Sequence, residues 1–257
     1  ETLLYWNDIV TIMSRLDRPD LTWYIPTNGT LLNEKHVDFF SKLKGKVTIG
    51  ISHDGPAHEL TRGREFLPKK NSVLRLLQEA KIPFSFNCVI SRSNHDLFAV
   101  DDYFSRYLFT AGLNPVPVVY ELGRVYDSTL TKNSYKHVIS GDQIPIYQQN
   151  LRRYLNKHIE EMKSGKQKLL KTNLVHFGNG VLPYARTLRS QVPISVRSNC
   201  GVDLAELLSI DLSGKVRTCQ NTSEAYSHGE LSNIEEVELH GVSLDKGGFC
   251  KNCSVLR

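Results

Sequence analysis

Four of the five cysteines in this 257-residue chain lie in its last 58 residues, spaced as Cys200-x18-Cys219-x30-Cys250-x2-Cys253. Four thiolates, two of them in a Cys-x-x-Cys turn, are typical of a tetrahedral zinc site or an iron–sulfur cluster. The odd cysteine count, together with a sequence that shows no secretory context, argues against a disulfide framework. We therefore predict that these four cysteines are metal ligands, with zinc and iron–sulfur both open.

Polar residues and glycines follow two expected strands. Thr27-Asn28-Gly29 follows the apolar run 21–25, and Ser52-His53-Asp54-Gly55-Pro56 follows the run 47–51. Parallel α/β sheets carry their chemistry at the carboxyl ends of strands, where hydroxyl and carboxylate groups can bind a ribose and glycine admits a ligand close to the backbone. Asn-Gly and Asp-Gly-Pro also form ordinary turns, so neither segment is specific by itself.

Alternating helices and strands would position these segments. Apolar periodicity, the capping residue Asn33 and the terminating Gly45 predict helices and strands in turn. The expected helices cover 6–16, 34–44, 73–80 and 96–109, and the expected strands cover 21–25, 47–51, 83–90 and 116–120. This alternation predicts βα units with a parallel sheet. Cys88, within the third strand from Phe84 to Ile90, is expected to be a small buried apolar residue.

The pattern changes after Glu121. A polar helix is expected over 147–162, and the runs 207–212 and 215–218 flank Ser213-Gly214 as a β-hairpin. We expect three regions: a βα domain over 1–126, a helical linker over 127–197 and a cysteine-rich domain over 198–257.

Composition favours a soluble globular protein, with 40% hydrophobic and 23% charged residues. No apolar run approaches the roughly 20 residues that span a membrane, so we expect no membrane partner and a cytoplasmic location. The net charge of +5 is mild and fits a solvated surface better than a nucleic-acid interface.

Three signatures resemble one family. The run Ile51–Pro56, followed by His58 and Arg62-Gly63, resembles the Ser-x-Asp-Gly-Pro…His…Arg segment of radical S-adenosylmethionine (SAM) enzymes, and Thr27-Asn28-Gly29 is similar to the preceding strand end in that family. Cys200-x13-Gly214-x4-Cys219 resembles the first half of the SPASM-domain pattern, and Cys250-x2-Cys253 resembles the start of its second half. The resemblance covers nearly the whole chain.

The resemblance implies a partial (β/α) barrel of radical SAM type, followed by a small SPASM-like cysteine-rich domain with a β-hairpin. It also implies a catalytic [4Fe–4S] cluster, bound SAM and hydrogen abstraction from a peptide or protein by a 5′-deoxyadenosyl radical. The cofactor supplies this chemistry, and the protein orients it and excludes water. An electron-donor protein would be a further partner.

The resemblance also implies roles for individual residues. Glu1 would accept hydrogen bonds from the cofactor's ammonium group, and Arg62 or Arg64 would lie near its carboxylate. Thr27 and Asn28 would border the cofactor, and Ser52 and Asp54 would lie near its ribose. Cys200 and Cys219 would bind one auxiliary cluster and Cys250 and Cys253 would begin a second, although all four could share one site, and zinc is the non-redox alternative.

Two departures bear on completeness and substrate. The family's Cys-x3-Cys-x2-Cys loop does not occur here, Glu1–Tyr5 looks like the tail of the family's Gly-Gly-Glu-Pro-Leu segment, and the family has further cysteines after Cys253. We therefore expect the chain to be part of a longer protein. Sulfatase maturases carry an Asp that serves as the catalytic base directly after the cysteine that matches Cys219. Here that residue is Gln220, which has no carboxylate to accept a proton. This difference favours a peptide maturase of another kind.

Two alternatives remain. The chain could be a non-catalytic zinc- or cluster-bound scaffold that binds peptide for a true enzyme. It could also be an ordinary α/β enzyme in which His53 and Asp54 act in acid–base catalysis on a phosphate or sugar.

Overall fold

A computed structural model describes residues 1–16, 18–43, 45–122, 139, 141–165, 209–210, 213–217 and 227–237. The chain divides into two compact units, Glu1–Gly123 with Lys136–Phe177, and Arg124–Tyr135 with Gly178–Arg257. Because most of 123–208 lies outside the described residues, the boundaries expected at 126 and 197 stay predictions.

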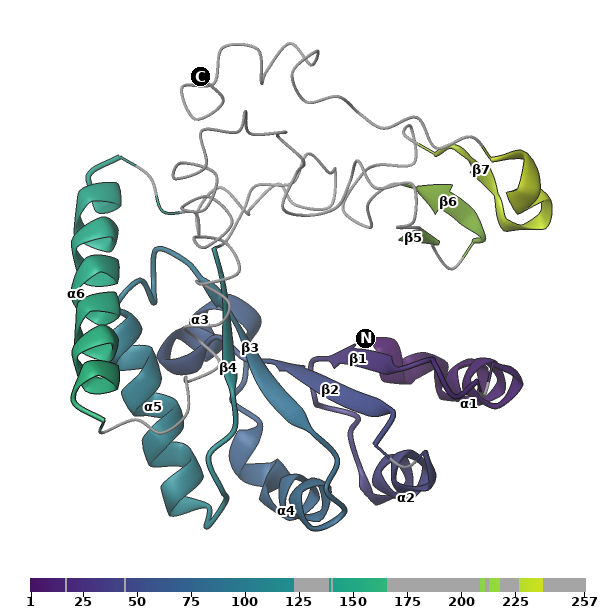
Figure 1. Cartoon of the computed structure of the whole chain (residues 1–257), viewed down its shortest axis with the longest axis horizontal. Helices are drawn as coiled ribbons and strands as arrows, with labels where there is room; N and C mark the ends of the chain where they lie inside the picture. Colours follow the sequence, from purple (N-terminus) through teal and green to yellow (C-terminus); the bar gives the residue numbers. More distant parts are fainter. Residues whose placement is uncertain are drawn as a thin grey trace. The chain divides into compact units, whose positions relative to one another are not determined.

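The first unit is built on a four-stranded parallel sheet in the order β1-β2-β3-β4 (Figure 1). The strands are β1 (Trp23–Thr27), β2 (Val47–Ser52), β3 (Phe84–Ile90) and β4 (Val118–Leu122). Thr27 pairs with Ile51, and Ser52 pairs with Asn87, so the first three strands end near one another at one edge. The predicted α/β fold with a parallel sheet is confirmed.

Helices lie between successive strands, and α2, α4 and α5 cover the same side of the sheet, with α6 alongside α5 (Figure 1). Asn33 caps α2 in a capping box with His36, as the sequence predicted for Asn33, and the Asp96 side chain caps α5. The helical elements are η1 (Thr2–Tyr5), α1 (Trp6–Arg15), α2 (Glu34–Lys42), η2 (Gly55–Ala57), α3 (His58–Arg62), η3 (Leu67–Lys70), α4 (Asn71–Glu79), α5 (Leu97–Thr110) and α6 (Gln143–Lys163).

The hydrophobic core lies between the sheet and these helices. Alternate strand residues point to opposite faces, so Phe86 and Cys88 are buried on the helix side, where Phe86 stacks on Phe104 of α5 with ring centroids 4.7 Å apart. Full burial of a side chain such as Phe86 contributes about 1.5–3 kcal/mol. The opposite face carries polar residues, including Thr48, Ser52 and Asn87. The prediction that Cys88 is buried is confirmed.

The structure differs from the sequence analysis at several places. Strand β1 covers Trp23–Thr27 rather than 21–25, so Thr27 is its last residue, and α6 begins at Gln143 rather than at 147. The segment after Asp54, where no helix was expected, contains η2, α3 and η3, and prolines lie in the first turn of both 3₁₀ helices because their fixed φ suits that position. Strand β4 begins at Val118 rather than Val116, because Pro117 has no N–H to donate to a neighbouring strand.

In the second unit, the described residues form a small antiparallel sheet in the order β5-β6-β7. Its strands are β5 (Ser209–Ile210), β6 (Lys215–Arg217) and β7 (Gly229–Glu230), followed by η7 (Leu231–Glu236). Gly214 has φ +82° between β5 and β6, a left-handed conformation that glycine adopts without strain. The predicted β-hairpin is therefore confirmed, whereas Cys200, Cys219, Cys250 and Cys253 lie outside the described residues.

Within the described part of the chain, no helix is both long and apolar enough to span a bilayer.

Candidate cofactor site at the carboxyl edge of the sheet

Glu1 is held at the carboxyl end of β1. Its Oε2 accepts a hydrogen bond from the backbone N–H of Asn28 at 2.7 Å, and its Oε1 accepts one from the Thr27 hydroxyl. The Thr27 hydroxyl oxygen in turn accepts a hydrogen bond from Gly29 N at 3.0 Å. Three of the residues predicted from the sequence therefore lie in direct contact, with the Glu1 carboxylate at the strand end.

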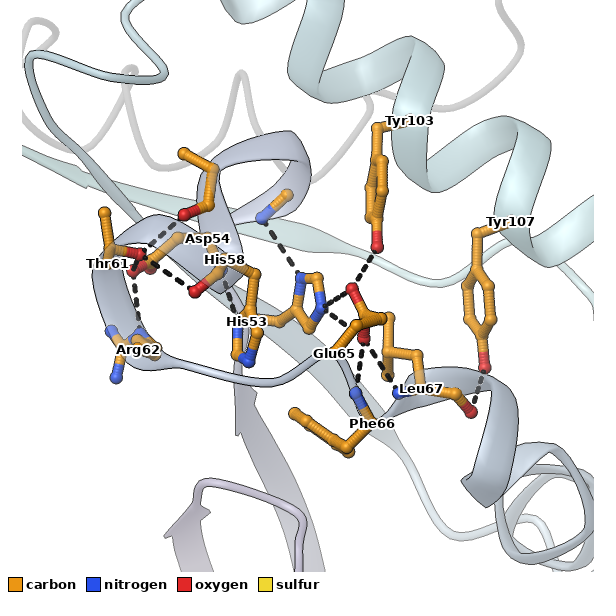
Figure 2. Close-up of polar contacts among 12 residues, drawn as sticks. His53, Asp54, His58, Thr61, Arg62, Glu65, Phe66, Leu67, Tyr103 and Tyr107 are labelled. Carbon is orange, nitrogen blue, oxygen red and sulfur yellow. Dashed lines mark hydrogen bonds and ion pairs between the residues drawn. The ribbon is translucent and has the colours of Figure 1, made fainter.

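Asp54 follows the carboxyl end of β2 and joins three elements (Figure 2). Its Oδ1 accepts a hydrogen bond from Val89 N of β3 at 3.0 Å. Its Oδ2 accepts from Arg62 Nε at 2.8 Å and lies 2.7 Å from the Thr61 hydroxyl, both on α3. The Asp54 side chain is 5% exposed and that of Arg62 is 33% exposed. Asp54 therefore fixes α3, and with it Arg62, against the ends of β2 and β3.

The buried His53 and the half-buried Glu65 form a pair that supports this segment (Figure 2). The His53 Nδ1 accepts a hydrogen bond from Gly55 N at 3.1 Å, which leaves the proton on Nε2 to donate to Glu65 at 2.9 Å. Glu65 also accepts from the Tyr103 hydroxyl at 2.6 Å and from Leu67 N at 2.8 Å. Burial opposes the ionisation of Glu65, but these hydrogen bonds outweigh it and lower its pKa to about 2.

His58 lies directly against His53. The two rings stack with centroids 3.9 Å apart and planes 7° apart, and His58 Nδ1 lies 3.4 Å from the backbone N–H of Asp54. Burial, reinforced by the neighbouring His53, lowers the pKa of His58 to about 4. A neutral His58 ring can accept from Asp54 N, so both histidines help to fix the backbone around Asp54.

Side chains from β1 and β3 meet over β2 on the face away from the core. Asn87 Nδ2 donates to the Tyr24 hydroxyl, and Ser85 Oγ lies 3.2 Å from Asn87 Oδ1. A Cβ built on Gly50 would lie 1.9 Å from the Tyr24 oxygen and 2.6 Å from Asn87 Nδ2, so only glycine leaves room for this bridge. Beyond the bridge, towards the amino ends of the strands, lies a cavity of about 760 Å³ lined by Tyr24, Thr48, Ser85 and Asn87 among others.

Two further predicted residues lie near this edge without a described partner. Ser52 ends β2 and is half-buried, and Arg64 is exposed just beyond α3. Neither side chain makes a hydrogen bond or ion pair with another residue that the structure describes. Arg62, which Asp54 anchors, is therefore better placed than Arg64 for a fixed role.

Glu65, Tyr103 and the Tyr24–Gly50–Asn87 arrangement were missed by the sequence analysis. The one available signal was that a buried His53 would need a polar partner.

No metal site is seen in the described part of the chain, where no three His, Cys, Asp or Glu side chains are grouped to hold an ion. Cys88, the described cysteine, is buried and free, and burial raises the pKa of its thiol well above the usual value.

The donor set at the sheet edge has a specific chemical character. It offers the Glu1 carboxylate at the end of β1 and the Arg62 guanidinium beside the end of β2. An α-amino acid group carries the complementary ammonium and carboxylate. The charges of Glu1 and Arg62 are therefore complementary to those of an amino acid group such as the methionyl moiety of SAM.

No family model matches the chain, but individual known proteins are similar to it. The radical SAM cyclopropyl synthase TigE of Paramaledivibacter caminithermalis is 23% identical over 267 residues, an alignment that covers 100% of this chain and 51% of that protein. A cysteine-type anaerobic sulfatase-maturating enzyme of Clostridium perfringens is 29% identical over 120 residues, covering 43% of this chain and 32% of the enzyme. The chain is thus similar to a radical SAM enzyme and to an anaerobic sulfatase-maturating enzyme. The chain spans about half the length of the cyclopropyl synthase.

Solved structures show the fold. The native anSMEcpe enzyme with bound AdoMet (SAM) matches with a TM-score of 0.61 at 17% identity, over 98% of this chain and 68% of that one. The same enzyme with AdoMet and a Cp18Cys peptide matches with a TM-score of 0.64 at 18% identity, over 98% and 69%. The chain therefore shares the α/β fold of anSMEcpe.

Proposed function

We propose that this chain binds SAM at the carboxyl edge of its parallel sheet and belongs to a radical SAM enzyme that modifies a peptide or protein. The observation that carries the proposal is that a carboxylate, Glu1, and a guanidinium, Arg62, are each anchored beside one of two neighbouring strand ends. Together with a reduced [4Fe–4S] cluster, bound SAM supplies a 5′-deoxyadenosyl radical that abstracts hydrogen from substrate. The family's Cys-x3-Cys-x2-Cys ligand motif for that cluster does not occur in the 257 residues.

Each residue has a defined part in this proposal. Thr27 and Asn28 orient the Glu1 carboxylate, whose remaining lone pairs accept from the cofactor's ammonium group. Arg62 donates to the cofactor's carboxylate, and Ser52 borders the ribose. The first unit then corresponds to a partial (β/α) barrel.

We extend the proposal to the cysteine-rich end. We expect a SPASM-like domain over 198–257 to contain a β-hairpin, and the β5–β6 hairpin with Gly214 supports this proposal. Cys200, Cys219, Cys250 and Cys253 would then hold one or two auxiliary iron–sulfur clusters, and a four-thiolate zinc site is the alternative. If the protein is a non-catalytic scaffold, we expect the four cysteines to hold zinc.

The substrate class rests on the relatives. A solved neighbour holds a Cp18Cys peptide together with AdoMet, and a curated relative is named as a sulfatase-maturating enzyme. Gln220 occupies the position where sulfatase maturases have an Asp that acts as the catalytic base, and this difference favours a peptide maturase of another kind. An electron-donor protein would deliver the reducing equivalent.

The rival acid–base enzyme has less support. His53 is fully buried and hydrogen-bonded to both Gly55 and Glu65, and the Asp54 carboxylate is engaged by three donors. Neither group is presented to a ligand as a general base requires.

The test is cofactor cleavage by protein expressed from its intact gene, purified without oxygen and reconstituted with iron and sulfide. We expect a brown protein that contains acid-labile sulfide and forms 5′-deoxyadenosine from SAM when dithionite is added. The Cys200→Ala/Cys219→Ala variant should contain less iron. A colourless protein with stoichiometric zinc and no 5′-deoxyadenosine would instead establish the scaffold.

A further inference from the structure

The Asp54 carboxylate is already engaged by the protein. Val89 N donates to Oδ1 at 3.0 Å, and Arg62 Nε and the Thr61 hydroxyl lie 2.8 and 2.7 Å from Oδ2. These donors come from two different elements, β3 and α3. With its side chain 5% exposed, Asp54 presents almost no surface to a ligand.

Arg62 differs from Asp54 in this respect. One-third of its side chain is exposed, and its contact with Asp54 uses Nε. A guanidinium is a planar fork of five N–H donors, and the edge formed by its two Nη atoms can bind a carboxylate through two parallel hydrogen bonds. No hydrogen bond from the Nη atoms to another described residue is present. Anchoring through Nε therefore fixes the plane of the fork and leaves the Nη edge for a ligand.

Asp54 is itself held rigidly. Its backbone carbonyl accepts from Asn94 Nδ2 at 3.0 Å, and its backbone N–H lies 3.4 Å from His58 Nδ1. The next residue, Gly55, has φ +61°, a conformation that few other residues adopt. Fixing a flexible arginine before the ligand arrives reduces the entropy lost on binding.

We infer that Asp54 is a positioning residue, which aims Arg62 at the carboxylate of the cofactor and does not itself bind the ribose. This inference rests on the proposed function, since it takes SAM as the ligand. It differs from the expectation drawn from the family resemblance, which put Asp54 near the ribose.

The two possibilities differ in which ligands they affect. SAM carries a ribose and an α-carboxylate, whereas 5′-methylthioadenosine carries the same ribose and no amino acid group. Substituting a residue that acts on the carboxylate through Arg62 should lower the affinity for SAM alone. A residue that touches the ribose matters for both ligands.

The experiment measures dissociation constants of both ligands by isothermal titration calorimetry, on anaerobically reconstituted protein from the intact gene. A charge-assisted hydrogen bond contributes about 1.5–3 kcal/mol, so Asp54→Asn and Arg62→Ala should each weaken SAM binding by roughly ten- to hundredfold. Both variants should bind 5′-methylthioadenosine within about threefold of wild type, and Asp54→Asn/Arg62→Ala should bind SAM no more weakly than Arg62→Ala.

Arg62→Lys provides a second variant that keeps the charge and needs no change at the buried Asp54. Lysine lacks the planar fork, so it cannot hold Asp54 and present a bidentate edge, and we expect at least about tenfold weaker SAM binding. The exposed ion pair of Asp102 with Arg106 supplies matched controls, and Asp102→Asn and Arg106→Ala should leave both ligands unaffected.

Three results would overturn the inference. Asp54→Asn could weaken the binding of SAM and of 5′-methylthioadenosine equally. Its effect on SAM binding could add to that of Arg62→Ala. Finally, Arg62→Lys could bind SAM with the affinity of the wild type. A wild-type protein that binds neither ligand would instead overturn the proposed function, and the inference with it.

Discussion

The amide of Asn87 donates a hydrogen bond to the hydroxyl of Tyr24 across the face of β2, directly over Gly50. This contact joins β1 to β3 on the side of the sheet away from the core. Tyr24 and Asn87 also line the cavity towards the amino ends of the strands. The absence of a side chain at Gly50 makes the contact possible.

Gly50→Ala should therefore destabilise the protein. The added methyl group would lie 1.9 Å from the Tyr24 oxygen, well inside van der Waals contact, so Tyr24 must move and its bond to Asn87 must break. Because Tyr24 is 53% exposed, its ring can move towards solvent, and the expected cost is that of the lost hydrogen bond, about 0.5–1.5 kcal/mol. Urea unfolding followed by circular dichroism measures the loss.

Tyr24→Ala supplies the control for Gly50→Ala. In the Gly50→Ala/Tyr24→Ala protein the clash with Tyr24 is gone, and the Asn87 amide, 2.6 Å from the added methyl group, no longer has Tyr24 as a partner and can turn away. The Gly50→Ala change should therefore cost little beyond Tyr24→Ala alone. Equal unfolding free energies for wild type and Gly50→Ala would show that the bridge is not held as described.

Lys81→Gly should stabilise the protein. Lys81 has φ +55°, just after the end of α4, where Lys81 N donates to Gln78 O and Ile82 N donates to Leu77 O. This is the helix-ending arrangement in which glycine is favoured, and a side chain in the left-handed conformation costs about 1 kcal/mol. We expect a gain of about 1 kcal/mol in unfolding free energy, measured by urea titration.

Lys81→Ala is the matched variant, because it removes the lysine but keeps a Cβ. It should lack the gain seen with glycine. If alanine and glycine stabilise equally, the effect belongs to the lost lysine side chain and not to the backbone conformation.

Stability should fall in mild acid because of His58. Its folded-state pKa of about 4 lies below the ordinary 6.5, so the folded protein binds this proton less tightly than the unfolded chain. The stabilisation is complete above pH 6.5 and is lost as pH falls from 6.5 to 4, by on the order of 2–3 kcal/mol. His58→Gln keeps an acceptor for Asp54 N and should remove this slope. Urea unfolding at intervals across that window measures it.

The buried His36, whose pKa burial also lowers, is present in both proteins, so its contribution cancels in the comparison with His58→Gln. Parallel stability curves for wild type and His58→Gln between pH 6.5 and 4 would contradict the assignment to His58.

Glu65 should act in a lower pH window. Its folded-state pKa of about 2 lies below the ordinary 4.5, so its stabilisation is present above pH 4.5 and is lost as pH falls towards 2. Glu65→Gln should be less stable at neutral pH, because His53 and Tyr103 lose a charged acceptor, and its stability should change less between pH 4.5 and 2. Acid titration followed by tryptophan fluorescence tests this. An unchanged acid slope would place the responsible carboxylate elsewhere.

The sequence predicted the order of helices and strands because burial on one face leaves a periodic pattern. It also predicted the Asn33 cap and the buried Cys88, since both depend on local residue type. The short helices between Gly55 and Lys70 carry too few residues to show a period, and the sequence analysis missed them.

The candidate site was predicted in part. Position at a strand end singled out Thr27, Asn28 and Asp54, whereas Glu1 and Arg62 came from the family resemblance alone. The contacts that support the segment around Asp54 could not be predicted, because His53 and Glu65 are 12 residues apart in the sequence and Tyr103 and Glu65 are 38 apart. Such contacts leave no local pattern. The four cysteine ligands stay predictions, since they lie outside the described residues.

Binding of SAM to wild-type and Glu1→Gln protein, reconstituted anaerobically from the intact gene, tests the central claim most directly. Wild type should bind SAM, and Glu1→Gln should bind it about tenfold or more weakly, because the charged acceptor for the ammonium group is lost. Both proteins should bind 5′-methylthioadenosine equally. Equal affinity of the two proteins for SAM, or no binding by wild type, would contradict a SAM site at this edge of the sheet.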